Sequence, residues 1–185
     1  MPNIPEVTST SNSTEIIQKN TFGVFFQIDY HPDTQKYSIS DMGNGYGTFI
    51  QLSSSLIIKE NSLINIGDSY LVFSFQEENN LMLKMYSGNY QYEPMYLQSE
   101  EGKIITIGRE EKCDICLNDK MLSRVHCVLI YDKENGWSIT DGNGKENGSK
   151  SMNGTWVFAF ENVEIIDGMI FKSNSNLLSC HYIFE

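Results

Sequence analysis

The chain has 185 residues, of which 40% are hydrophobic and 20% charged, and it contains only 4 prolines. This composition is typical of a folded protein with one domain or two small ones. The formal net charge of -11 repels nucleic acid and anionic membranes, so we expect neither as a partner.

The first segment, residues 1–20, is rich in Pro, Ser, Thr and Asn and predicts a polar tail. It lacks the basic start and apolar stretch of a signal peptide. Nowhere in the chain does an apolar run approach the roughly 18 residues of a membrane helix. We therefore expect an intracellular protein, whose compartment (cytoplasmic, nuclear or cytoskeletal) the sequence does not distinguish.

From Thr21 onward, short apolar runs alternate with turn clusters about every ten residues, without a helical period. Aromatic residues reach 12%, which favours β-structure. Such a series is typical of an all-β, antiparallel sandwich. The predicted strands are Val24–Tyr30, Tyr37–Ser40, Thr48–Leu52, Leu56–Ile58, Tyr70–Phe75, Leu81–Tyr86, Met95–Gln98, Ile104–Ile107, His126–Tyr131, Trp137–Thr140, Thr155–Phe158, Met169–Lys172 and Leu178–Phe184.

Two parts of this series are similar, residues 23–75 and residues 125–184. Each runs through an apolar strand ending near Tyr, an Asp/Asn turn, a Ser/Thr-Ile-Ser/Thr-Asp step, a Gly-rich loop, Gly-Thr-aromatic, and a closing strand rich in Tyr and Phe. We interpret this as an internal repeat. The sequence therefore predicts a partial β unit over residues 21–77 and a complete one over residues 78–185.

The four cysteines are expected to be reduced thiols, because no secretion signal is present. Cys113 and Cys116 form a lone CxxC, and the nearest second pair for a zinc site is His126 with Cys127. The alternative, which we favour, is that these cysteines are small apolar residues entering and lining a strand. We expect neither a metal nor another cofactor.

Three short motifs in the second half place polar groups at strand ends: Ile107-Gly108-Arg109, Leu122-Ser123-Arg124-Val125-His126 and Asn153-Gly154-Thr155-Trp156. Arg109 and Arg124 are the only arginines among 13 basic residues. Guanidinium groups match phosphate oxygens bidentately, and Ser123 adds a hydroxyl. The motifs together therefore predict a phosphate site.

In their order and spacing, the three motifs resemble the signature of the forkhead-associated (FHA) domain, over about residues 81–185. The resemblance implies a β-sandwich whose loops at one end bind phosphothreonine peptides. It implies that Arg109 and Ser123 contact the phosphate, that Arg124 flanks it, and that Asn153 holds the peptide backbone. The residues expected to support the site structurally are Gly108, His126, Gly154 and Thr155.

One position departs from the family pattern. Met152 stands where the family usually has Thr or Ser before the Asn of the third motif, and Ser151 is a candidate substitute. Losing one such hydrogen bond to a charged group costs about 1.5–3 kcal/mol, which weakens a site without abolishing it. The first unit contains no arginine, and Tyr46 stands in place of the motif's Asn, so we expect no binding there.

The sequence does not favour an enzyme. It shows no Walker loop, nucleophile elbow or paired-carboxylate arrangement, and Ser123 and His126, three apart on a strand, would point to opposite faces. Two hypotheses follow. The first is a phosphothreonine-reading adaptor or subunit of a larger complex. The second is a structural FHA-fold component that docks constitutively, without phosphate dependence, and whose partial unit offers an open strand edge.

Overall fold

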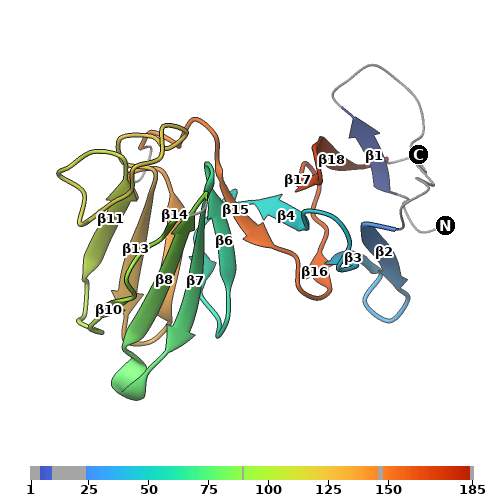
Figure 1. Cartoon of the computed structure of the whole chain (residues 1–185). Coiled ribbons are helices and arrows are strands. Elements are labelled where there is room, and N and C mark those ends of the chain that lie inside the picture. Colours follow the sequence, from blue (N-terminus) through green and yellow to red (C-terminus); the bar gives the residue numbers. More distant parts are fainter. Residues whose placement is uncertain (1–4, 10–23, 89, 146–147, 184–185) are drawn as a thin grey trace. The chain divides into compact units, whose positions relative to one another are not determined.

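The computed structural model describes residues 5–9, 24–88, 90–145 and 148–183 (Figure 1). They form β-strands and one 3-10 turn, η1 (Glu77–Asn79), so the predicted all-β class is confirmed. No helix in these ranges has the length and apolar character needed to span a bilayer. The chain divides into two compact units. We call residues 52–157 the contiguous unit, and residues 1–51 with 158–185 the split unit.

The contiguous unit contains two sheets. The first has the order β15–β6–β7–β8–β10, with β9 also paired to β8, and the second has the order β12–β11–β13–β14–β5. Neighbouring strands are antiparallel, except that β11 and β12 are parallel. The strands are β5 (Leu56–Ile57), β6 (Leu63–Ile66), β7 (Ser69–Phe75), β8 (Leu81–Ser87), β9 (Tyr90–Gln91), β10 (Met95–Leu97), β11 (Ile104–Gly108), β12 (Ile115–Cys116), β13 (Cys127–Asp132), β14 (Gly136–Asp141) and β15 (Thr155–Phe158).

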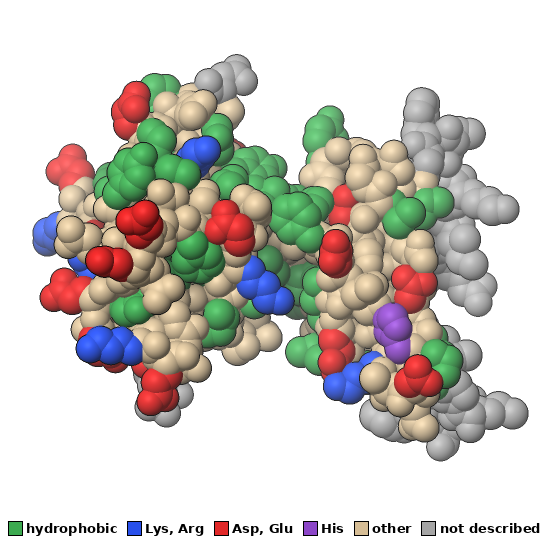
Figure 2. Space-filling model, turned by 90° about the horizontal axis from the view of Figure 1, so that it is seen from below, with side chains coloured by type: hydrophobic (Ala, Val, Ile, Leu, Met, Phe, Trp, Pro, Cys, Tyr) green, Lys and Arg blue, Asp and Glu red, His purple; other side chains and the backbone are tan. Residues whose placement is uncertain are grey.

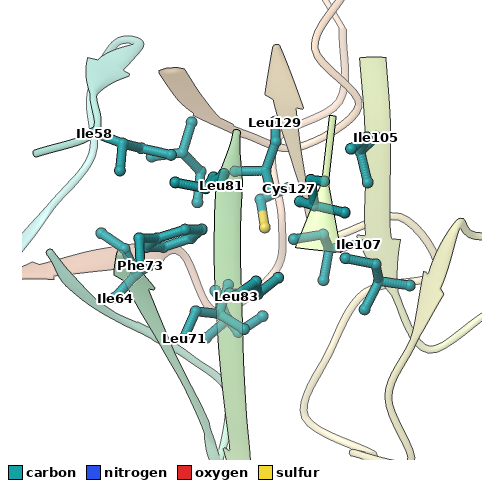
Figure 3. Close-up of a cluster of buried hydrophobic side chains, with 14 of the residues drawn as sticks. Ile58, Ile64, Leu71, Phe73, Leu81, Leu83, Ile105, Ile107, Cys127 and Leu129 are labelled. Atoms are coloured by element: carbon teal, nitrogen blue, oxygen red, sulfur yellow. The ribbon is translucent and has the colours of Figure 1, made fainter. Parts of the chain in front are cut away.

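The core of the contiguous unit lies between its two sheets. Leu71 and Phe73 of β7 are fully buried, as are Leu81 and Leu83 of β8, because alternate residues of a strand face the same side. Figure 3 shows these side chains meeting Ile105, Ile107, Cys127 and Leu129 from the second sheet. Burial of this apolar surface stabilises the sandwich and holds the loops at its ends.

The split unit also contains two sets of paired strands. One has the order β1–β18–β17–β4, and the other has the order β16–β3–β2. The strands are β1 (Pro5–Ser9), β2 (Phe26–His31), β3 (Lys36–Asp41), β4 (Thr48–Gln51), β16 (Val163–Glu164), β17 (Ile170–Ser173) and β18 (Asn176–Tyr182).

Residues 5–9, within the segment predicted as a polar tail, are a strand. These residues form β1, which pairs antiparallel with β18 from Pro5↔Tyr182 to Ser9↔Leu178. The reason is that an open strand edge offers backbone hydrogen bonds to any extended segment, whatever its polarity. The rest of the predicted tail, residues 1–4 and 10–20, lies outside the described residues.

The units also divide the chain differently from the predicted segments 21–77 and 78–185. β7 and β8 are neighbours over seven residue pairs, from Ser69↔Ser87 to Phe75↔Leu81, and only residues 76–80 connect them. They form a hairpin that crosses the predicted boundary, and short antiparallel connections of this kind rarely separate two domains. Residues 52–77 therefore belong to the contiguous unit.

Two series of six strands correspond along the chain. β2 to β7 have lengths of 6, 6, 4, 2, 4 and 7 residues, and β13 to β18 have the same lengths in the same order. An internal repeat would produce such equal lengths, and the repeat stays a prediction. The contiguous unit contains β13 to β15, the first three strands of the second series, together with β5 to β7, the last three strands of the first series. The split unit contains β2 to β4 from the first series and β16 to β18 from the second. The two series have thus exchanged their last three strands within one chain.

Candidate functional site

Two loops of the contiguous unit run side by side where β11 ends and β13 begins. The Arg109 N–H donates to the Ser123 carbonyl oxygen at 3.2 Å, and the Glu110 N–H donates to the Arg124 carbonyl oxygen at 3.2 Å. Arg109 and Arg124, the two arginines predicted for the phosphate site, therefore lie on neighbouring loop segments, although fourteen residues of chain separate them. The same backbone bonds bring Ser123 next to Arg109.

Gly108 permits this close approach. It is buried, and a Cβ atom at this position would collide with the carbonyl oxygen of Arg124, which is a backbone atom and cannot turn aside. A glycine is therefore needed so that the two loops can hydrogen-bond to each other. This agrees with the structural role that the sequence assigns to Gly108.

The third motif joins the same end of the sandwich. The Met152 N–H donates to Ser123 Oγ at 3.0 Å, and Asn153 Nδ2 donates to the Met121 carbonyl oxygen at 2.7 Å. Trp156 Nε1 donates to the Asn153 carbonyl oxygen at 2.8 Å, which fixes the turn. Among the described residues, Asn153 Oδ1 accepts no hydrogen bond, so it can receive one from a peptide N–H.

His126 connects all three motifs from within the core. Its exposed fraction is 0%, and its Nδ1 accepts from the Ser123 N–H at 3.1 Å. Its Nε2 lies 3.0 Å from the Gly154 carbonyl oxygen, which can only accept, so the proton is on Nε2 and the ring is neutral. Burial lowers the pKa of His126, which also favours the neutral ring. His126 therefore braces the loops and has no free nitrogen with which to act as a base.

The arginine side chains are exposed and available. Neither Arg109 nor Arg124 forms an ion pair with any residue that the structure describes, including the adjacent Glu110. The Ser123 hydroxyl accepts one hydrogen bond and donates none within the same residues, so its proton is available to an anion. Figure 2 shows Lys and Arg side chains scattered among acidic and hydrophobic ones on the face in view.

Ser151 does not replace the hydroxyl that is missing at Met152. Ser151 Oγ donates to Asp141 Oδ1 at 2.6 Å, and the Ser151 N–H donates to Asp141 Oδ2 at 3.1 Å. Thr155 Oγ1 donates to the same carboxylate at 2.7 Å, which gives Thr155 the expected supporting role. The Met152 side chain is 90% exposed, so it projects into solvent beside Asn153.

Two residues that support the site, Asp141 and Asp119, were not predicted as part of it. Asp141 holds Ser151 and Thr155, and Asp119 contacts the loop before Ser123. The signal available for both was a carboxylate beside apolar core residues, and such a group is buried only when it is hydrogen-bonded.

The cysteines of the CxxC motif lie beside this site. Cys113 is buried and its Sγ donates to the Arg124 carbonyl oxygen at 3.2 Å, whereas Cys116 is exposed. Across the described ranges, no three His, Cys, Asp or Glu side chains are grouped so as to hold a metal ion.

Comparison with known proteins supports the same assignment. The family model described as "FHA domain" matches residues 105–174. The chain is 39% identical over 66 residues to the E3 ubiquitin-protein ligase RNF8 of Rattus norvegicus and to that of Mus musculus. Each match covers 34% of this chain and 12% of the relative, so the chain matches about an eighth of those proteins. FHA domains are protein–protein interaction modules and are not catalytic. The chain therefore contains a forkhead-associated domain, matched over residues 105–174.

Proposed function

We propose that the contiguous unit binds phosphothreonine-containing segments of a protein partner. Arg109 and Ser123 contact the phosphate, Arg124 flanks it, and Asn153 holds the peptide backbone. The observation that carries the proposal is the pair of backbone hydrogen bonds between residues 109–110 and 123–124. These bonds set two exposed arginines, without ion pairs among the described residues, beside the Ser123 hydroxyl.

The chemistry of the site suits a phosphate ester. A phosphothreonine carries a charge of about -1.5 to -2 at neutral pH and three strong acceptor oxygens. A guanidinium group binds such oxygens bidentately, and each of these hydrogen bonds is charge-assisted. The net charge of -11 repels anions at long range, so recognition depends on these short contacts rather than on a broad basic surface.

The role proposed for Asn153 follows from its hydrogen bonds. Its Nδ2 is held by the Met121 carbonyl oxygen at 2.7 Å, so the direction of the amide is set before a ligand arrives. Its Oδ1 then accepts from the backbone N–H of the peptide, which selects an extended protein segment over a free phosphate.

The test is calorimetric titration of the full chain with a phosphothreonine peptide library. The Arg109→Ala variant should weaken binding by at least about a hundredfold, because it removes a charge-assisted bidentate contact. Lys133→Ala is the matched control, since it removes one exposed positive charge in the turn after β13, at the opposite end of that strand. Unchanged affinity in Arg109→Ala would remove the phosphate assignment.

A second candidate function is constitutive docking as a structural component, and two observations favour it. Ser151 is committed to Asp141, so the hydroxyl missing at Met152 is not replaced. Among the described strands, β2 pairs only with β3, whereas the corresponding β13 pairs with both β11 and β14. The open edge of β2 suits the addition of a strand from a partner.

Co-purification from the protein's own cells, before and after phosphatase treatment, separates the two candidates. Loss of all partners after phosphatase supports the reader, or small adaptor, function. Retention of the partners supports constitutive docking within a larger complex. A free monomer in both samples would contradict both candidates.

A further inference from the structure

A turn from the first half of the chain contacts the loop that carries Ser123. The carboxylate of Asp119 is the connection, and only 5% of this residue is exposed. Its Oδ2 accepts from the Asp68 N–H at 2.8 Å and from Ser69 Oγ at 2.7 Å. Both donors belong to the turn between β6 and β7 or the residue that follows it, about fifty residues earlier in the chain.

The other oxygen of the same carboxylate holds the binding loop. Asp119 Oδ1 accepts from the Met121 N–H at 2.8 Å, and the Leu122 N–H donates to the Asp119 backbone carbonyl oxygen at 3.2 Å. The Met121 carbonyl oxygen in turn accepts from Asn153 Nδ2 at 2.7 Å. A continuous series of hydrogen bonds thus runs from Ser69 through Asp119 and Met121 to Asn153.

The turn is itself held firmly, so it can fix the carboxylate. Buried Asn65 donates through Nδ2 to the Gly67 carbonyl oxygen at 3.2 Å and to the Ser69 carbonyl oxygen at 3.0 Å. Gly67 has a φ of +54°, and a Cβ there would lie 2.9 Å from Asp119 Oδ2 and 3.0 Å from Met121 Cβ. Glycine therefore allows both the backbone conformation and the close approach of the turn to the loop.

A buried carboxylate needs all of these donors. An ionised group removed from water is stable only when hydrogen bonds replace its hydration, so losing one donor forces it to move towards water or another donor. Because Asp119 also holds the Met121 N–H, such a movement displaces the loop between β12 and Ser123. The displacement reaches Asn153 through the Met121 carbonyl oxygen.

We propose that Ser69, acting through Asp119, is a positioning residue of the phosphopeptide site. The proposal rests on the proposed function, and it adds that the first half of the chain completes the site. Ser69 lies outside residues 105–174, which match the FHA family model, and in a strand that corresponds to β18 of the other series. The exchanged hairpin β6–β7 thus supplies a support that residues 78–185 alone do not contain.

The test uses the full chain and three variants. Ser69→Ala removes one donor to the carboxylate, and Asp119→Asn removes its charge while keeping its shape. Ser74→Ala is the matched control, because Ser74 is a half-buried serine of the same strand whose hydroxyl makes no hydrogen bond within the described residues. The measurements are affinity for a phosphothreonine peptide, the thermal unfolding midpoint, and the NMR shifts of the Asn153 side-chain amide and the Met121 and Ser123 backbone amides without peptide.

We expect Ser69→Ala and Asp119→Asn to weaken peptide binding about tenfold and to shift the Asn153 side-chain amide, with no such change in Ser74→Ala. A merely structural role would lower the unfolding midpoint but leave the affinity of the folded protein and the Asn153 signal unchanged, and that result overturns the proposal. If Ser69→Ala does not fold, Asp119→Asn decides on the same readouts. If the wild-type chain binds no phosphothreonine peptide, the proposed function fails, and the coupling of turn to loop still stands or falls on the amide shifts.

Discussion

The two units contain two series of corresponding strands, yet only the contiguous unit carries the candidate site, and only that unit also contains β8 to β12. The connection between β3 and β4 in the split unit is residues 42–47, whereas the connection between β14 and β15 in the contiguous unit is residues 142–154. The longer connection holds Ser151, Met152 and Asn153. This part of the difference is a loop between strands of equal length, and the other part is the segment from β11 to β13 that carries Arg109, Ser123 and Arg124.

The residue before the first strand of each series, Phe25 or His126, shows that the fold and the site depend on different groups. The Gly142 N–H donates to the His126 carbonyl oxygen at 2.7 Å, and the Met42 N–H donates to the Phe25 carbonyl oxygen at 2.9 Å. The backbone bond is therefore present in both units. The ring nitrogens that join Ser123 to Gly154 are present only in His126, because Phe25 has none. Backbone pairing maintains the fold, and a few side chains convert one copy into a candidate binding site.

We expect the largest effect on folding when two fragments with different boundaries, residues 52–157 and residues 78–185, are compared. Residues 52–157 contain both sheets of the contiguous unit in one continuous segment, so this fragment should fold cooperatively and bind phosphopeptide. Residues 78–185 lack β5, β6 and β7, which leaves Leu81 and Leu83 without their register partners Phe75 and Phe73, so this fragment should not fold. Dispersion of amide signals by NMR and thermal unfolding of both fragments provide the measurement.

This experiment can also contradict the exchange of strands. Because β17 and β18 have the same lengths as β6 and β7, residues 78–185 contain a hairpin that could take the empty place. A well-folded monomer of residues 78–185, together with an unfolded fragment 52–157, would show that each series keeps its own hairpin.

The sequence predicts the fold class and the site motifs better than the division into units. Alternating apolar residues identify strands such as β7 and β8, since the pattern is local. A local pattern does not predict which unit each hairpin joins. Corresponding strands of the two series can complete either unit, and their sequences do not distinguish the two arrangements. β6, with only four residues, was not predicted as a strand.

The residues that support the site could not be predicted from the sequence for a similar reason. Arg109, Ser123 and Asn153 belong to recognisable motifs, and the structure brings their loops together. Asp119 and Ser69 belong to no motif, and their importance arises from a contact across about fifty residues of chain. Ser151 was a reasonable substitute for Met152 from its position alone, but the partner that occupies it, Asp141, is visible only in three dimensions.

A smaller effect is expected from converting His126 to the residue at the corresponding position of the other unit. His126→Phe leaves the Ser123 N–H and the Gly154 carbonyl oxygen without partners, so the free energy of unfolding should fall by about 2–3 kcal/mol near pH 7.5. Urea denaturation measures the loss. A variant as stable as the wild type would contradict the bracing role.

The effect of His126→Phe on the unfolding free energy should also depend on pH, in a direction set by the pKa of His126. Burial lowers the pKa of His126 in the folded state below its unfolded value of about 6.5. Between these two values, unfolding takes up a proton, so the contribution of His126 is complete above about pH 6.5 and declines as the pH falls. The difference in unfolding free energy between the wild type and His126→Phe should therefore narrow below pH 6.5. A difference that widens on acidification would mean that the folded state binds the proton more tightly.

The smallest expected effect is a gain at the position where the contiguous unit departs from the family pattern. Met152 is 90% exposed, so Met152→Thr should leave the unfolding midpoint unchanged while offering a hydroxyl beside the proposed phosphate position. One added hydrogen bond to a charged group strengthens binding by about tenfold. Met152→Val is the matched control, because valine has nearly the shape of threonine without the hydroxyl. Calorimetry with the same phosphothreonine peptide should show tighter binding for Met152→Thr than for Met152→Val. Equal affinity in the two variants would mean that the side chain at residue 152 does not reach the phosphate, and that the loop of the contiguous unit presents only Asn153 to the ligand.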